Sequence, residues 1–420
     1  MSKKEVLVLG GGVAGSSLAY FLHKKGYQVK LIEKNSSGVG GLSRTYKYAG
    51  HPYEFGPHIW FWTDEELNSH IRKLANDELY YIDRKLFTYV EKDRKKYRYP
   101  IHFSSINEMS DKEEILKQLQ VNRDKNYKLK PEKLPVIGEC KFEDYFKSAI
   151  GKNLYSKFME DYTHKMWNIP GNKLETSMVW ADRFKHEYEK LKGYDPIKFE
   201  DHTLGKGINF QIYPKKGWNQ IWDTMVKDAE IIIDEVVKIY DEDTDDPYIL
   251  TKNTGKYYFS DYHAVINTLD MDLIWGEDSL EYTGRMIVPL LMPDLNTAFP
   301  ENTESFHYSG KEFQTRVTEM KTITKYESSE TLILIEIPVT SKINDNAFPE
   351  NVISNAKENN LFCKRAYPQQ TKEMFKIYDR LKAKGKNIKN LYHCGRHAEF
   401  KYWGMPETVN SAFQLIKLSF

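Results

Sequence analysis

The N-terminal segment EVLVLGGGVAGSSLAYFLHKKGYQVKLIEKN, residues 5–35, constrains the fold of this chain more than any other stretch. Residues 6–9 form an apolar run typical of a buried parallel strand, and residues 16–25 have the apolar spacing of a helix. Residues 28–32 form a second apolar strand. A glycine-rich turn joins the first strand to the helix, so the segment predicts a dinucleotide-binding Rossmann-like unit.

The glycines of this turn fit the pattern G-x-G-x-x-G at Gly10, Gly12 and Gly15. The first glycine permits the tight turn, the second lets a pyrophosphate approach the backbone, and the third lets the helix pack closely. Glu33 ends the second strand, where a carboxylate would accept hydrogen bonds from an adenosine ribose. The predicted dinucleotide contacts are Gly10, Gly12, Val13, Ala14, Gly15, Glu33 and Lys34.

The next segment, SSGVGGLSRTYKYAGHPYEFGPHIWFW, favours FAD over NAD. Its second glycine pair, residues 40–41, and the following Ser43 and Arg44 are similar to flavoproteins of the amine oxidase type, in which this loop runs beside the flavin. An NAD dehydrogenase would usually continue with another helix and strand. We therefore expect further cofactor contacts from Gly41, Leu42 and Ser43.

The C-terminal segment NLYHCGRHAEFKYWGMPETVNSAFQLIKL predicts a strand at residues 390–393, a Gly-Arg turn and a last helix that begins at Met405. Flavoproteins of this type close the cofactor site with such a segment. An ordinary surface helix is the alternative, but it leaves the clustered Arg396, Tyr402 and Trp403 unexplained. The expected flavin contacts in this segment are Gly395, Arg396, Met405 and Thr408.

Composition excludes several other classes of protein. The 61 Lys and Arg residues against 60 Asp and Glu give no general field for nucleic acid or an anionic membrane. The three cysteines have neither disulfide nor metal-ligand spacing, so no metal is expected. No apolar run approaches the roughly 18 residues of a membrane span, and the first residues read as a strand and not a signal peptide. We therefore expect a cytoplasmic protein that binds neither membrane nor nucleic acid.

Short motifs along most of the chain resemble, in matching order, those of the flavin-dependent UDP-galactopyranose mutases. EFGPHIWFW (54–62) is similar to a Gly-Pro-His-Ile segment whose histidine sits by the flavin, here His58 followed by Ile59. DYTHKMWNIP (161–170) is similar to a Tyr-Thr-x-x-x-Trp-Gly helix that frames the nucleotide base and sugar, here with Tyr162 and Trp167. YRYPIHFSSIN and YPKKGWNQIWDTM have weaker counterparts in the same family.

The resemblance continues through the second half of the chain. HYSGKEFQTRVTEMK (307–321) resembles Asn-Tyr-x-x-x-x-x-x-Thr-Arg-x-x-Glu-x-Lys, which implies that Arg316 clamps the diphosphate. KRAYPQQ supplies Tyr367, and GRHAEFKYWGM resembles Gly-Arg-x-x-x-Tyr-x-Tyr-x-Asp-Met and supplies Arg396 and Tyr402. Each match alone is modest, but several in order are specific to this family.

The residue chemistry agrees with this resemblance. Guanidinium forks bind phosphate oxygens in pairs, and tyrosine hydroxyls add neutral donors without overcharging a site. Simpler alternatives exist for three of these residues. Arg316 could pair with Glu319, His58 could be an ordinary packed histidine, and Trp167 could belong to the core.

The chain departs from the family pattern at several positions expected near the substrate. Gly404 replaces an aspartate, Phe400 replaces the first tyrosine of its motif, and Asn168 replaces a glycine. An Arg-Ile-Pro-Val-Arg stretch is replaced by WADRFKHE, in which only Arg183 or Lys185 could stand in for the second arginine. A nucleotide sugar other than UDP-galactose is therefore as plausible a substrate.

The resemblance implies a redox-neutral isomerisation between the pyranose and furanose forms of a nucleotide-diphosphate sugar, with N5 of reduced FAD as nucleophile at the anomeric carbon. Arg316, Arg396, Tyr367 and Tyr402 would hold the diphosphate, and His58 would orient the flavin or the sugar. It further implies an external reductant such as NAD(P)H, a role in bacterial-type surface polysaccharide synthesis, and a homodimer. The alternative is an FAD-dependent oxidase or dehydrogenase of the amine oxidase or protoporphyrinogen oxidase type.

We therefore predict an α/β protein in which an FAD-binding Rossmann-like domain carries an inserted helical domain and a mainly antiparallel β-sheet domain. The expected parts are FAD-binding segments at 1–84, 201–270 and 386–420, a β-ribbon at 85–105, a helical insertion with the nucleotide-base site at 106–200, and an antiparallel sheet roofing the flavin at 271–385.

Overall fold

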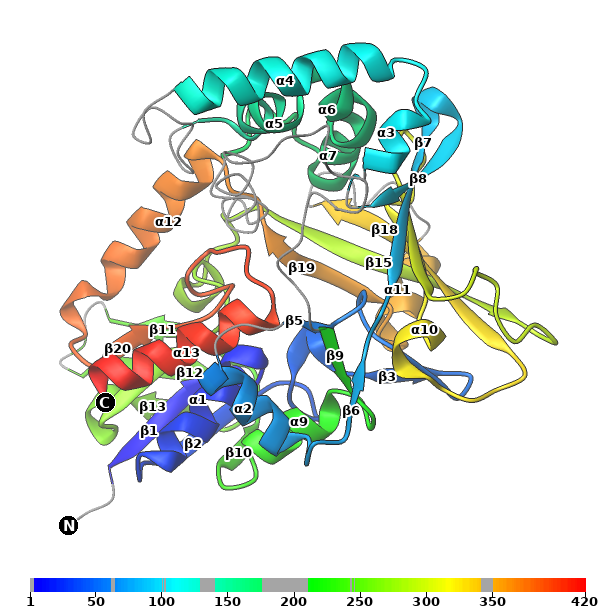
Figure 1. Cartoon of the computed structure of the whole chain (residues 1–420). Helices are drawn as coiled ribbons and strands as arrows, with labels where there is room; N and C mark the ends of the chain where they lie inside the picture. The colour runs from blue at the N-terminus through cyan, green and yellow to red at the C-terminus, as the bar shows by residue number, and fades with distance from the viewer. Residues whose placement is uncertain are drawn as a thin grey trace.

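The computed structural model describes residues 4–61, 65–99, 101, 103–128, 140–175, 211–241, 244, 246–340 and 350–420. A nucleotide-binding part, a large sheet and a group of helices make up this part of the chain (Figure 1). Arg183 and Lys185 lie outside the described residues.

A five-stranded parallel sheet forms the nucleotide-binding part, in the order β10-β2-β1-β14-β20. Its strands are β1 (Glu5–Leu9), β2 (Gln28–Glu33), β10 (Glu230–Ile233), β14 (Ala264–Asn267) and β20 (Leu391–His393). The central strand β1 is buried throughout residues 6–9, as expected for a parallel strand covered on both faces. Helix α1 (Val13–Lys24) and the last helix α13 (Met405–Ser419) pack side by side, although they lie at opposite ends of the chain (Figure 1).

A seven-stranded sheet lies beside this part, in the order β19-β15-β18-β17-β16-β7-β8. Its neighbouring strands are antiparallel except for the parallel pair β16 and β7. The strands are β7 (Lys85–Val90), β8 (Lys95–Tyr99), β15 (Tyr282–Met292), β16 (Thr303–Tyr308), β17 (Arg316–Glu319), β18 (Thr331–Thr340) and β19 (Phe362–Pro368). Together with the parallel sheet, it confirms the predicted fold class.

Three smaller sheets contain the other described strands. They are the pair β3 (Tyr46–Tyr48) and β4 (His51–Tyr53), the trio β5 (Trp60–Phe61), β9 (Gln211–Pro214) and β6 (Leu79–Tyr81), and the trio β11 (Val236–Tyr240), β12 (Tyr248–Thr251) and β13 (Lys256–Tyr258).

A group of helices covers one end of the large sheet (top of Figure 1) and has its own apolar core, in which Ile115, Phe146 and Leu154 are buried. These helices are α3 (Phe103–Asn107), α4 (Lys112–Lys128), α5 (Phe142–Ile150), α6 (Lys152–Phe158) and α7 (Glu160–Trp167). The remaining described helices are α2 (Glu65–Leu74), α9 (Asn219–Met225), α10 (Lys321–Thr324), α11 (Glu350–Glu358) and α12 (Lys372–Lys384).

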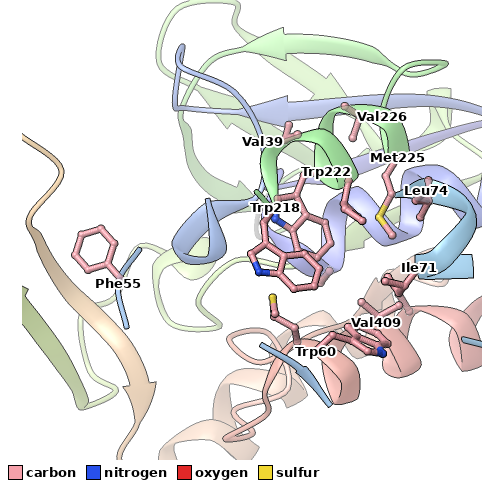
Figure 2. Packing of buried hydrophobic residues seen from close by; sticks show 14 of the residues in the cluster. Val39, Phe55, Trp60, Ile71, Leu74, Trp218, Trp222, Met225, Val226 and Val409 are labelled. Carbon is pink, nitrogen blue, oxygen red and sulfur yellow. The ribbon is translucent and has the colours of Figure 1, made fainter. Parts of the chain in front are cut away.

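A tryptophan pair anchors the core next to the glycine-rich loops. Trp218 and Trp222 stack with ring centroids 5.6 Å apart and 20° between their planes (Figure 2). A Cβ added at Gly40 would lie 2.4 Å from the Trp222 ring, so this glycine lets the loop approach the indole. Trp218 Nε1 donates to the carbonyl of His58 at 2.6 Å, which fastens a second loop to the same core.

Candidate active site

The turn between β1 and α1 has the geometry that its glycines predict. Gly10 adopts φ +93°, and a Cβ at Gly15 would lie 1.8 Å from the Gly10 carbonyl oxygen. A Cβ at Gly12, in contrast, would meet no atom within 4 Å. The turn therefore requires Gly10 and Gly15 for its own folding. Gly12 leaves open space beside the N-terminus of α1, where a pyrophosphate would bind.

Glu33 fastens this turn to the end of β2. Its two carboxylate oxygens accept backbone N–H groups of Gly11 at 2.7 Å and Asn35 at 2.8 Å. A carboxylate has about four acceptor sites, so it can still receive a ribose hydroxyl. The adjoining Lys34 is exposed.

The second glycine loop lies against the first. Gly40 N–H donates to the Gly11 carbonyl at 2.7 Å, and a Cβ at Gly41 would lie 3.2 Å from the Gly12 Cα. Gly41, Leu42 and Ser43 form one short 3₁₀ turn, whose Ser43 hydroxyl donates to the Gly40 carbonyl at 2.8 Å. The predicted contacts Gly41, Leu42 and Ser43 thus adjoin the fingerprint turn.

The C-terminal segment returns to the same place. Gly395 adopts φ +93°, and a Cβ there would lie 2.5 Å from the Cβ of Ala14 and 3.8 Å from the Thr408 side chain. Met405 begins α13, and the Thr408 hydroxyl donates to the Gly404 carbonyl at 2.7 Å. Three segments far apart in sequence therefore surround the N-terminus of α1, and these residues fit the pyrophosphate end of an FAD.

His58 sits in a loop that a buried carboxylate holds. Glu54, which is fully buried, accepts the His58 backbone N–H at 3.0 Å, the Tyr213 hydroxyl at 2.7 Å and the Thr45 hydroxyl at 2.9 Å. The His58 Nδ1 atom lies 3.4 Å from the same carboxylate. This network fixes the loop that carries His58.

The same loop adjoins Arg316. A Cβ at Gly56 would lie 2.6 Å from the Arg316 Nη2 atom. The Arg316 guanidinium forms a paired hydrogen bond with Glu336, at 2.7 and 2.8 Å. Glu319 instead accepts the backbone N–H groups of residues 298 and 299, so Arg316 forms its ion pair with Glu336 and not with the predicted alternative, Glu319.

Arg285 is a candidate site residue that the sequence did not point to. It projects from β15, is 5% exposed, and lies 3.9 Å from the Glu336 carboxylate that Arg316 also contacts. Its guanidinium carbon is 4.9 Å from the centre of the Tyr367 ring. The available signal was a single arginine within the apolar strand YTGRMIVPLLM, which can be buried only beside an anion or a ligand.

Tyr367 and Tyr402 form one aromatic cluster with Arg396. The two tyrosine rings stack at 4.8 Å, and the Arg396 guanidinium lies 4.9 Å from the Tyr367 ring centre. Arg396 donates to the carbonyl oxygens of Trp403 at 2.6 Å and Ala366 at 2.9 Å, which fixes its direction. Burial raises the pKa of Tyr402 above its usual range, so its hydroxyl stays protonated and can donate.

Tyr162 and Trp167 of helix α7 pack against different partners. Trp167, the last residue of the helix, meets Tyr402 edge-on at 5.4 Å, whereas Tyr162 stacks on His307 of β16 at 6.3 Å. Trp167 is 3% exposed, so it is a core residue as well as a neighbour of the tyrosine pair. Tyr162 and Trp167, five residues apart, therefore contact different parts of the candidate site.

Two departures from the family pattern have clear structural roles. Phe400 is fully buried and stacks on Tyr378 of α12 at 5.7 Å, which places it in the core. Gly404 precedes α13, and its N–H donates to Glu407 at 2.9 Å.

Two other kinds of site are not found in the described part of the chain. Its residues include no group of three or more His, Cys, Asp or Glu that could hold a metal ion. Its helices include none that is both long and apolar enough to cross a membrane.

Comparison with known protein families gives two matches. A model described as UDP-galactopyranose mutase matches residues 157–402, which is more than half of the chain. A model described as NAD(P)-binding Rossmann-like domain matches residues 8–77, the segment with the glycine fingerprint.

Two bacterial proteins resemble the chain over nearly its whole length. The dTDP-fucopyranose mutase of Escherichia coli is 21% identical over 99% of this chain and 98% of its own. A probable UDP-galactopyranose mutase of Klebsiella pneumoniae is 21% identical over 99% of this chain and 94% of its own.

Solved structures share the fold at low identity. A reduced UDP-galactopyranose mutase has a TM-score of 0.78 and 16% identity, over 99% of this chain and 94% of its own. A putative protoporphyrinogen oxidase from Exiguobacterium sp. 255-15 has a TM-score of 0.72 and 16% identity, over 99% of this chain and 98% of its own. A mutase and a putative protoporphyrinogen oxidase thus share this fold, so the fold alone does not distinguish the two enzyme classes. The match to the family model favours the mutase. The chain belongs to the UDP-galactopyranose mutase family.

Proposed function

We propose that this protein interconverts the pyranose and furanose forms of a nucleotide-diphosphate sugar with FAD as cofactor. The observation that carries the proposal is the grouping of Arg285, Arg316, Tyr367 and Arg396 next to the His58 loop. Guanidinium groups and protonated hydroxyls in one place suit a diphosphate.

The charges of this group match those of the expected ligand. Three guanidiniums, from Arg285, Arg316 and Arg396, and one carboxylate, from Glu336, give this group a net charge of +2. The diphosphate of a nucleotide sugar carries about two negative charges, and a fixed cluster of opposite charge binds it with little reorganisation.

Bound in its reduced form, FAD would supply the nucleophile, N5, for attack at the anomeric carbon. The protein's own residues would then have to keep the diphosphate in place while it leaves the sugar and returns. Arg396 is suited to this, because two backbone carbonyls fix its direction. Tyr367 and Tyr402 add neutral donors that do not hold the anion too tightly.

His58 would orient the flavin or the sugar by hydrogen bonding. Its backbone is fixed by the buried Glu54 carboxylate and by Trp218, and its Nδ1 atom lies 3.4 Å from the same carboxylate. The proposal requires no side chain to act as a general base.

The substrate is a UDP-hexose such as UDP-galactose, or a related hexose or heptose linked to another nucleotide. One relative is described as a dTDP-fucopyranose mutase and the other as a probable UDP-galactopyranose mutase. The nucleotide of the substrate could therefore contain either deoxyribose or ribose. We further propose an external reductant such as NAD(P)H, a homodimer, and a role in surface polysaccharide synthesis.

The test is to incubate the protein with UDP-, GDP- and dTDP-linked sugars without oxygen, with and without dithionite. Chromatography should find an isomer of unchanged mass only when the flavin is reduced. No isomer from any sugar, together with hydrogen peroxide formation from another compound in air, would instead establish an oxidase.

A further inference from the structure

His307 joins the two ends of the candidate nucleotide site. It lies on β16 directly opposite Arg316 of β17 in the strand register. Its ring stacks on Tyr162 with 22° between the planes and a centroid distance of 6.3 Å. On β8, the Tyr99 ring lies 5.3 Å from it. An imidazole thus lies between the expected base platform and the expected diphosphate clamp.

The imidazole is neutral and has an unused hydrogen-bonding atom. Burial, with the charges of Arg316 and Arg84, lowers the pKa of His307 to about 3. A neutral imidazole has one donor and one acceptor nitrogen. Its Nε2 atom is buried and bonds to no group in the described residues, although such an atom costs free energy when it stays unpaired.

The position of His307 indicates what its ligand would be. This step rests on the proposed function, in which Tyr162 packs against the base and Arg316 binds the diphosphate. In a nucleoside diphosphate the pentose joins these two groups. A side chain that stacks on Tyr162 and lies opposite Arg316 in the sheet is therefore placed where the pentose would pass. The residue is partly exposed, and a half-turn about its χ2 torsion exchanges Nδ1 with Cδ2 and Nε2 with Cε1.

We propose that His307 recognises the pentose by hydrogen bonding to its 2′-hydroxyl, so that the protein prefers ribonucleotides to 2′-deoxyribonucleotides. A site that pairs a buried polar group with a substrate hydroxyl rejects the analogue that lacks this hydroxyl. The family pattern has an asparagine at this position, which is a shorter hydrogen-bonding side chain.

The test compares UDP with dUDP, which differ only in the 2′-hydroxyl, by calorimetric titration of the flavin-loaded protein. Wild-type protein should bind UDP at least about tenfold more tightly than dUDP, the worth of one hydrogen bond to a buried polar group. His307→Leu should bring this ratio close to one and leave the affinity for dUDP nearly unchanged. If the base is not uracil, GDP with dGDP and ADP with dADP serve in the same way.

Two further variants separate recognition from folding. His307→Asn keeps a hydrogen-bonding group and should retain part of the ratio. His70→Asn changes a histidine of α2 that contacts Tyr20 and Phe413, and should keep the wild-type ratio. Equal binding of UDP and dUDP to wild-type protein, or an unchanged ratio in His307→Leu, would overturn the inference alone. Failure of every nucleoside diphosphate to bind wild-type protein would overturn the proposed function as well.

Discussion

At the scale of single residues, the glycines of the first turn differ in what they are needed for. Gly15 has no room for a side chain, because the Gly10 carbonyl would lie 1.8 Å from its Cβ. Gly12 has room and adopts φ −67°, which any residue can adopt. Gly15 is thus required for folding, whereas Gly12 leaves space for a ligand.

This difference predicts opposite results for two alanine variants. Gly15→Ala should lower the free energy of unfolding of the flavin-free protein by about 2 kcal/mol, because the helix must move away from the strand. Gly12→Ala should leave that free energy unchanged and lower FAD affinity at least about tenfold, because its methyl group takes the place of the pyrophosphate. Urea unfolding and flavin titration measure the two effects. Equal losses of stability would contradict the argument.

Arg316 allows a second prediction at this scale. Arg316→Lys keeps the charge but loses the paired contact with Glu336, because an ammonium cannot bind two oxygens in a fixed fork. The affinity for the preferred nucleoside diphosphate should fall by about tenfold to a hundredfold. Arg380→Lys, in an exposed pair with Glu277, is the matched control and should bind as wild type does. Full affinity in Arg316→Lys would exclude Arg316 as the clamp.

At the scale of elements, helix α7 is fastened to strand β16 by one lysine. Lys165 is 10% exposed, donates to the Tyr308 carbonyl at 2.8 Å, and lies 3.7 Å from Glu312. Burial lowers the pKa of Lys165 to about 8, although Glu312 opposes this shift. The contact places Tyr162, three residues earlier on the helix, beside His307 of the strand.

The lowered pKa predicts how stability depends on pH. Between pH 8 and about 10.5, the unfolded chain binds more protons at Lys165 than the folded chain does, so folding becomes more favourable as pH rises. Lys165→Met removes this titration. The unfolding free energy of wild type minus that of Lys165→Met should therefore increase from pH 8 to 10.5 in urea unfolding. A constant difference across this window would show that Lys165 titrates normally.

At the scale of the whole molecule, the cofactor site is assembled from both ends of the chain. Helix α13 packs side by side with α1 (Figure 1), and its buried residues include Val409 and Ala412. The glycine fingerprint is therefore held in place by a helix that is nearly 400 residues later in the sequence.

This arrangement predicts an effect across the chain. Ala412→Asp places an unpaired charge in the core and should cost about 3 kcal/mol or more. Amide hydrogen exchange in α1 should then accelerate, and FAD retention should fall. Leu418→Asp changes the same helix at a side chain that is 82% exposed, and should do neither. Unchanged exchange in α1 with Ala412→Asp would mean that the two helices are not coupled.

The first strand, the helix and the second strand could be predicted from sequence alone, because their glycines and apolar spacing act within one short segment. It also indicated the order of the family motifs and the return of the last helix. These signals suffice for the fold class and for the expectation of FAD, since the local steric demands of Gly10 and Gly15 hold in any context.

Which charged groups lie together could be seen only in the folded chain. Arg316 pairs with Glu336 and not with the nearby Glu319, because strands β17 and β18 place residues 316 and 336 opposite each other. The same sheet brings Arg285 to this pair and His307 to the other side of Arg316, while Phe400 turns into the core. Strand register depends on contacts between distant segments, and local sequence does not specify it. The chemistry of the site therefore follows from pairing between strands that are remote in the chain.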